Sequence, residues 1–207
     1  MTFEGFPERA LEFYEGLEAD NSKAYWTDNK AVYDECVAEP MKELLAELEP
    51  TFGTAKLFRP YRDVRFSKDK TPYKTRQYAV VHEGDQGLYV GIDASGLHVG
   101  GGRFQSGPEQ VARLRAAIAD DRTGGTLVKE IAKLRKAGLQ IGGDQLKRVP
   151  KPWDDTHPRA DLLRHKSVIA SVDHEPAPWL HTSATKDRVV AGWKALGLLN
   201  AWLEQNA

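Results

Sequence analysis

Apolar residues recur every three or four positions in several long segments of the 207-residue chain, which is the spacing of helices that bury one face. Pro40 is expected to kink the second helix or to begin a new one. Gly124 and Gly125 are expected to separate the third helix from a further helix that ends before Gly138. The predicted helices begin at Pro7, Ser22, Pro108 and Ser183, and the last of them covers about residues 184–204.

In the middle of the chain the apolar pattern changes to a period of two, which is the spacing of strands. The short polar segments Glu83–Gly87 and Asp93–Gly96 are predicted to be tight turns, so the strands on either side of each turn run antiparallel. Helices on both sides of such a run predict an α+β fold, an antiparallel β-meander sheet covered by helices in a single domain over residues 1–207. The strands are predicted near residues 61–66, 73–82, 88–92, 97–100 and 167–172.

The stretch from Phe58 to Tyr78 carries far more positive than negative charge. The stretch contains seven arginines and lysines and only two aspartates, which gives it a local net charge of +5, whereas the net charge of the whole chain is −1. The sequence therefore predicts a basic β-hairpin over residues 58–81, in which two strands flank a polar turn. Strand alternation places Val64 and Phe66 toward the core and leaves the two lysines of the turn, Lys68 and Lys70, exposed.

Clustered arginine and lysine beside tyrosine are typical of a surface that binds an anion. Asp63 shares a strand face with Arg65 and is expected to neutralise it in part. Both a phosphorylated small molecule and nucleic acid suit such a site, and a net charge of −1 favours a local pocket for a small anion over a nonspecific DNA-coating surface. A second basic patch, Leu146–Trp153, enlarges the same groove if it folds beside the first. The candidate ligand-binding residues are Arg59, Arg62, Asp63, Arg65, Ser67, Lys68, Lys70, Tyr73 and Lys74.

The block RFSKDKTPYK, residues 65–74, follows Phe58-Arg59 and Arg62-Asp63. This run resembles the signature of a family of bacterial and fungal proteins called domain of unknown function 2461. The resemblance covers nearly the whole chain and implies a single-domain protein, and it implies no established activity. The chain has Ala24-Tyr25-Trp26 where the family pattern reads closer to a charged residue followed by Trp-Phe. Further matching positions are Trp26, Asn29, Tyr33, Leu146-Lys147, Pro150 and Leu162-Leu163 with Lys166.

Candidate catalytic groups form no recognisable motif, so catalytic residues stay unassigned and no cofactor or metal is predicted. The six histidines stand in no metal-binding pattern, and the groups Asp154–His157 and Asp173–Glu175 are interpreted as solvated surface. Cys36 is the only cysteine, which excludes an internal disulfide, and its helical spacing predicts buried packing. Gly100–Gly102 lacks the residues of a phosphate loop and predicts close backbone approach or a bulge.

Three functions remain open at this point. The preferred hypothesis is a soluble protein that binds a phosphate-bearing or other anionic ligand through the basic hairpin. The alternatives are an enzyme whose cations stabilise negative charge on a phosphorylated substrate, and a structural protein with a solvated basic edge. Whether the protein is an enzyme is left open because no general base is identified, and its oligomeric state is left open as well. The amino terminus lacks a signal-peptide pattern and no apolar run approaches about 20 residues, which predicts a cytoplasmic protein without a membrane partner.

Overall fold

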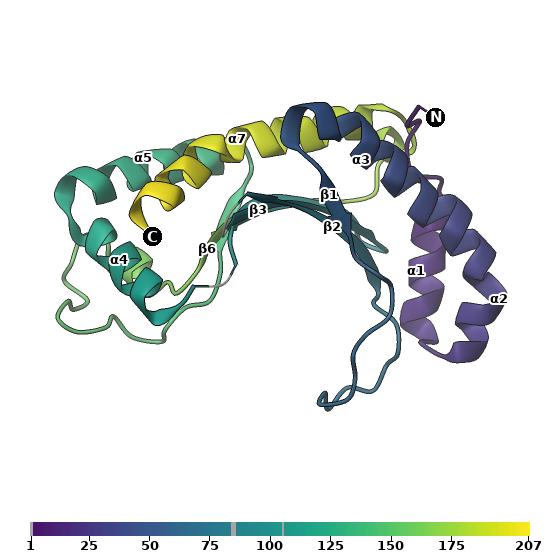
Figure 1. The fold of residues 1–207 in the computed structure, drawn as a ribbon, viewed down its shortest axis with the longest axis horizontal. Helices are drawn as coiled ribbons and strands as arrows, with labels where there is room; N and C mark the ends of the chain where they lie inside the picture. The colour runs from purple at the N-terminus through teal and green to yellow at the C-terminus, as the bar shows by residue number, and fades with distance from the viewer. Residues whose placement is uncertain (1, 84–85, 105) are drawn as a thin grey trace. The chain divides into compact units, whose positions relative to one another are not determined.

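The computed structural model describes residues 2–83, 86–104 and 106–207, and in it six strands form one antiparallel sheet (Figure 1). The strands are β1 (Ala55–Leu57), β2 (Arg76–Glu83), β3 (Gln86–Asp93), β4 (Gly96–Arg103), β5 (Gln140–Gly142) and β6 (Val168–His174). Their order is β1-β2-β3-β4-β6-β5, so the first four form a meander and β6 lies between β4 and β5. The predicted α+β class with an antiparallel sheet is confirmed.

The helices begin where the sequence provides suitable first residues. The Ser22 side chain accepts a hydrogen bond from the Tyr25 backbone N–H at 3.1 Å and caps α2. Pro40 lies in the first turn of α3, directly after a π-helical turn, so it begins a new segment without ending the helix. The helical segments are α1 (Arg9–Ala19), α2 (Lys23–Tyr33), η1 (Asp34–Ala38), α3 (Glu39–Phe52), α4 (Pro108–Ala119), α5 (Asp121–Lys136), α6 (Ala160–Leu163), η2 (Pro178–His181) and α7 (Ala184–Asn206).

The chain forms two compact units that share elements of this fold. Unit 1 contains the residues up to Val81 together with Tyr89–Val99 and Asp173–Val190. Unit 2 contains His82–Leu88, Gly100–Val172 and Ala191–Ala207. Four strands, β2, β3, β4 and β6, and helix α7 contribute residues to both units.

The first strand of the predicted hairpin lies earlier in the chain than expected. The strand is β1, which pairs antiparallel with β2 so that Leu57 is opposite Ala79. The predicted strand at 61–66 is wrong. Residues 58–75, here called the basic loop, extend from β1 and β2 as a long connection (Figure 1), in which Tyr61 and Tyr73 form an isolated bridge.

Local polar contacts in the basic loop replace the regular pairing of a strand. The Asp69 carboxylate accepts a hydrogen bond from the Thr71 backbone N–H at 3.0 Å, which closes the predicted turn. The Lys70 ammonium group donates to the Val64 carbonyl at 2.9 Å. Phe66 is 96% exposed and Val64 is half-buried, so their predicted burial is wrong, whereas Lys70 is exposed as predicted, as is its neighbour Lys68.

Aromatic side chains of unit 1 hold the returning arm of the basic loop against α2. The rings of Trp26 and Tyr73 stack with centroids 4.4 Å apart and planes 8° apart. Asn21 fixes the Tyr73 backbone from both sides, accepting from its N–H and donating to its carbonyl, each at 3.1 Å. The end of the loop that joins β2 is therefore fixed in position by long-range contacts.

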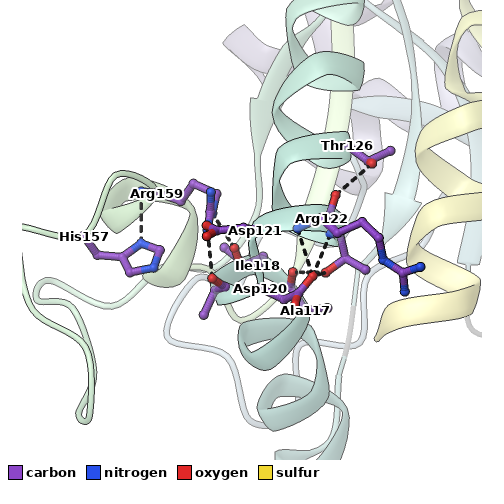
Figure 2. Close-up of polar contacts among 10 residues, drawn as sticks. Ala117, Ile118, Asp120, Asp121, Arg122, Thr126, His157 and Arg159 are labelled. Carbon is purple, nitrogen blue, oxygen red and sulfur yellow. Dashed lines mark hydrogen bonds and ion pairs between the residues drawn. The ribbon is translucent and has the colours of Figure 1, made fainter.

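In unit 2, helices α4 and α5 meet at a tight corner (Figure 2). The Arg159 guanidinium donates to the carbonyls of Ile118 at 2.6 Å and Ala119 at 2.7 Å, which are among the last carbonyls of α4. Asp120 then caps α5. Gly124 lies inside α5, so the predicted break there is wrong. A side chain at Gly124 would place its Cβ 2.1 Å from the Ile118 oxygen, and the glycine therefore permits the close approach of the two helices.

Candidate functional site

Two arginines of the basic loop are neutralised within the loop. Arg65 forms a bidentate pair with Asp63, with contacts of 2.9 and 2.7 Å, which matches the expected compensation. Arg62 contacts Asp69 at 2.5 Å. Hydrogen bonds from Thr71 and Arg62 hold the pKa of Asp69 at about 2, so this carboxylate is ionised throughout the neutral range. Both pairs are largely exposed and contribute little to stability.

The tip of the basic loop exposes an aromatic ring among cations. Phe66 extends into solvent, and the Arg65 guanidinium lies 5.9 Å from its ring centroid. Lys68 and Lys70 are exposed, and Ser67 is half-buried. The tip therefore offers positive charge beside an exposed ring and no hollow of its own among the described pockets.

The base of the basic loop borders a hollow of about 380 Å³, here called the Phe58 pocket. The Lys74 ammonium lies 5.3 Å from the Phe58 ring centroid, and the Lys56 ammonium lies 5.7 Å from the same ring. The Arg76 guanidinium lies 5.4 Å from the centroid of the Tyr78 ring. The pocket is lined by Phe58, Arg62, Lys74, Thr75, Arg76 and Tyr78.

Positive charge at this pocket is only partly balanced. Within residues 2–83, 86–104 and 106–207, no carboxylate forms an ion pair with Lys56, Arg59 or Lys74. The Lys74 ammonium instead donates to the Arg59 carbonyl at 2.9 Å. Burial and the nearby Arg59 charge lower the pKa of Lys74. A bound anion would relieve this repulsion, because it supplies the missing opposite charge.

Buried hydrogen bonds fix the strand end that carries Phe58. The Tyr33 hydroxyl donates to the Gln77 side-chain oxygen at 2.6 Å, and the Gln77 amide nitrogen donates to the Phe58 carbonyl at 2.6 Å. Gln77 is buried on the opposite face of β2 from Arg76 and Tyr78. The aromatic wall of the pocket is thus positioned by the interior of unit 1.

Arg76 also connects the pocket to a polar cluster on neighbouring strands. Its Nε lies 3.5 Å from a carboxylate oxygen of Asp93. The His98 ring lies between two carboxylates, with Nε2 2.9 Å from Asp93 and Nδ1 2.7 Å from Asp173. We call Asp93, His98 and Asp173 the His98 cluster. The Ser95 hydroxyl donates a further hydrogen bond, of 2.6 Å, to the buried Asp93 carboxylate.

The two carboxylates favour the protonated form of the His98 ring. Burial lowers the pKa of His98, but its hydrogen bonds to Asp93 and Asp173 outweigh burial and raise the pKa above its ordinary value. Burial raises the pKa of Asp93, but contacts with His98 and Ser95 outweigh it and hold the pKa at about 2. Both ring nitrogens are occupied, and Arg76 together with a protonated His98 balances the two carboxylates, so the cluster suits a contact that joins neighbouring strands. No three Asp, Glu, His or Cys side chains in the described parts of the chain are arranged to hold a metal ion.

The predicted site residues separate into three groups. Arg62 and Lys74 line the Phe58 pocket, and Arg59 is joined to it through its carbonyl, which accepts a hydrogen bond from Lys74. Asp63, Arg65, Ser67, Lys68 and Lys70 lie in the middle of the loop and are not among the residues that line the pocket. Tyr73 is 6% exposed and packs on Trp26, which leaves its ring little surface for a ligand.

Sequence analysis missed several residues of the pocket and the whole His98 cluster. Lys56 and Phe58 are two positions apart, at β1 and directly after it, so strand periodicity predicts that their side chains share a face. This signal could have indicated that a cation and a ring lie together there. For the cluster, Asp173 was interpreted as solvated surface, and its side chain is 74% exposed, yet it contacts His98. The two are 75 positions apart, so no local spacing indicates this contact.

Fold and site together define an α+β protein with a cationic loop at one end of a β-meander. A model of the family described as conserved hypothetical protein (DUF2461) matches residues 9–202, and the chain belongs to this family. The resemblance inferred from the RFSKDKTPYK block is confirmed. No curated protein matches the chain. In the described residues, no helix has both the length and the apolar character needed to span a bilayer.

Proposed function

We propose that the protein binds a phosphate-bearing small molecule in the Phe58 pocket. One observation carries the proposal. The ammonium groups of Lys56 and Lys74 lie 5.7 and 5.3 Å from the Phe58 ring centroid, the nearby Arg59 charge lowers the pKa of Lys74, and none of these three cations pairs with a carboxylate in the described chain. Phosphate is the anion whose charge and several acceptor oxygens suit such a set of donors.

The size and walls of the pocket favour a small ligand over a polymer. Its volume of about 380 Å³ lies in the range of small-molecule sites. Phe58 and Tyr78 provide ring faces against which a planar part of the ligand packs, while the cations hold the phosphate. The net charge of −1 for the whole chain also disfavours general binding to a polyanion. The proposal concerns binding, and no catalytic step is assigned.

Nucleic acid is the second candidate, and the exposed ring at the loop tip favours it. Phe66 stands in solvent beside Arg65, with Lys68 and Lys70 nearby, as in surfaces that stack an unpaired base while cations contact the backbone. This candidate uses the tip, whereas the small-molecule proposal uses the base of the loop. Substitutions at the two ends therefore distinguish them.

The test measures binding of AMP and ribose 5-phosphate by calorimetry at low salt, with adenosine as the uncharged control. Lys74→Gln is expected to weaken binding of both phosphates by about tenfold, the effect of losing one charged contact. Arg59→Gln, at an exposed position, should act in the same direction without disturbing the interior. Lys68→Gln is the matched control at the tip and should leave binding unchanged. Thermal melts establish that each variant is folded.

Two results count against the small-molecule proposal. One is failure of both phosphates to bind the parent protein at low salt, and the other is equal binding by the parent, Lys74→Gln and Arg59→Gln. If a single-stranded oligonucleotide binds instead, with log K falling against log salt at a slope of about −0.7 per phosphate contact, and Phe66→Ala weakens it, nucleic acid is the ligand.

A further inference from the structure

Unit 2 contains a cavity of about 610 Å³ that the proposed function does not use. Its walls come from residues between β4 and α4, from α4 itself, from the segment that follows β5 and from the segment that precedes β6. They combine apolar surface, two cations, one carboxylate and hydroxyl groups. The lining residues used below are Phe104, Ser106, Val111, Arg115, Asp144, Leu146 and Lys166.

Arg115 is the central group of this cavity because its charge is partly buried without a partner of opposite sign. Its Nε donates to the Leu163 carbonyl at 3.0 Å. Its Nη2 is buried and has no hydrogen-bond partner among the described residues, and within the same ranges no carboxylate pairs with the guanidinium. Burial accordingly lowers the pKa of Arg115. A buried, unsatisfied guanidinium N–H is costly, so the site is suited to a ligand that brings an acceptor.

Neighbouring groups add further donors to the same cavity. The Ser106 hydroxyl is buried and lacks a partner in the described chain. Ser106 directly precedes Gly107, the N-cap of the 12-residue helix α4, whose amino terminus carries partial positive charge. Lys166 supplies a second, exposed cation to the lining. These groups favour one negative charge in the cavity.

The remaining lining residues indicate the chemical character of the rest of the ligand. Phe104, Val111 and Leu146 provide apolar surface. The Asp144 carboxylate also lines the cavity, and it opposes a second negative charge while it accepts a hydrogen bond from a ligand hydroxyl or amine. A compact inorganic ion uses only part of this lining, whereas an anion with an apolar body uses all of it.

We propose that this cavity, referred to as the Arg115 cavity, binds a small amphipathic anion. Its carboxylate or phosphate head contacts Arg115 and Ser106, and its apolar body packs against Phe104 and Val111. The proposal is independent of the Phe58 pocket, because it rests on different residues in the other unit.

The experiment uses the full chain, with hexanoate and hexyl phosphate as anionic probes and hexanol as the neutral control. Binding is measured by calorimetry and by the NMR shifts of the Val111 and Leu146 methyl groups. Both anions at about millimolar concentration should shift these methyls, and the tighter binder identifies the head group. Arg115→Gln is expected to weaken binding by about tenfold and Lys166→Gln by a few-fold. Arg122→Gln, an exposed arginine of α5 outside the lining, is the control and should bind as the parent does.

Arg115→Gln also removes the contact with Leu163, so its melting temperature is measured alongside binding. Should that variant fail to fold, Ser106→Ala and Lys166→Gln carry the test, and each is expected to weaken both anions. The proposal is overturned if neither anion shifts the methyls of the parent, if hexanol binds as tightly as the anions, or if Ser106→Ala and Lys166→Gln both bind like the parent.

Discussion

Two aromatic residues of the basic loop differ strongly in solvent exposure. Phe66 is 96% exposed, whereas Tyr73, seven positions later, is 6% exposed. Tyr73 is buried because Trp26 and Asn21, from a distant part of the chain, pack on its ring and bind its backbone. Phe66 has no such neighbour among the described ring contacts apart from Arg65. Apolar character alone therefore did not identify the buried residue.

At the residue scale, the His98 cluster predicts a pH-dependent contribution to stability. Because the pKa of His98 is raised in the folded protein, its stabilising contacts are complete below the ordinary value of 6.5 and fade as the pH rises through the folded pKa. The pKa of Asp93 is lowered from 3.8 to about 2, so its contribution is lost only as the pH falls toward that value. His98→Gln should thus cost about 1–3 kcal/mol at about pH 5.5 and less at about pH 9.

Urea denaturation of the parent and of His98→Gln at both pH values measures this difference. His82→Gln is the control, because His82 is an exposed histidine on β2 outside the cluster. Its effect on the free energy of unfolding should be small at either pH. An equal loss for His98→Gln at the two pH values would show that the ring acts by packing and not by its charge.

At the scale of elements, adjacent glycines of α5 should respond to alanine in opposite directions. Alanine at Gly125 meets no atom within 4 Å and should stabilise the helix by about 0.5–1 kcal/mol through higher helix propensity. Alanine at Gly124 would place Cβ 2.1 Å from the Ile118 carbonyl oxygen and 2.7 Å from the Arg159 side chain, and it should destabilise the protein by about 1–3 kcal/mol. Thermal melts of the two variants check the sign. Stabilisation by Gly124→Ala would contradict the close packing of the α4–α5 corner.

Glycine in β4 also reflects packing between elements. Gly102 has a φ of 127°, and a Cβ there would lie 2.4 Å from the Val168 carbonyl oxygen of β6. A Cβ at Gly101 would likewise lie 2.7 Å from the Gly87 carbonyl oxygen. The expectation of close backbone approach for Gly100–Gly102 is confirmed at these two positions. These glycines are explained by strand packing alone, without a nucleotide ligand.

At the scale of the whole molecule, we expect the two compact units to unfold in one transition. Four strands and α7 contribute residues to both units, so neither unit can lose its strands without removing part of the other. The indole NMR signals of Trp26 in unit 1 and Trp202 in unit 2 should disappear at the same urea midpoint. Gly102→Ala, a change within unit 2, should lower both midpoints equally, at a cost of more than about 1 kcal/mol. Separate midpoints for the two indoles would contradict this expectation.

The sequence by itself determined the α+β class, the meander from β2 to β4 and the family. Helical stripes, capping residues such as Ser22, and short turns are local signals, because each depends on residues a few positions apart. It also located an excess of positive charge in residues 58–78, since charge is a property of composition.

Only the tertiary structure decided where that charge gathers and which groups are neutralised. The Phe58 pocket depends on the pairing of β1 with β2 and on Gln77, which hydrogen-bonds to Tyr33 44 positions away. The His98 cluster depends on Asp173 from β6, and the Arg115 cavity combines side chains of residues 104–115 with side chains of residues 144–167. These contacts are set by chain folding over long sequence separations, which periodicity and local spacing do not encode.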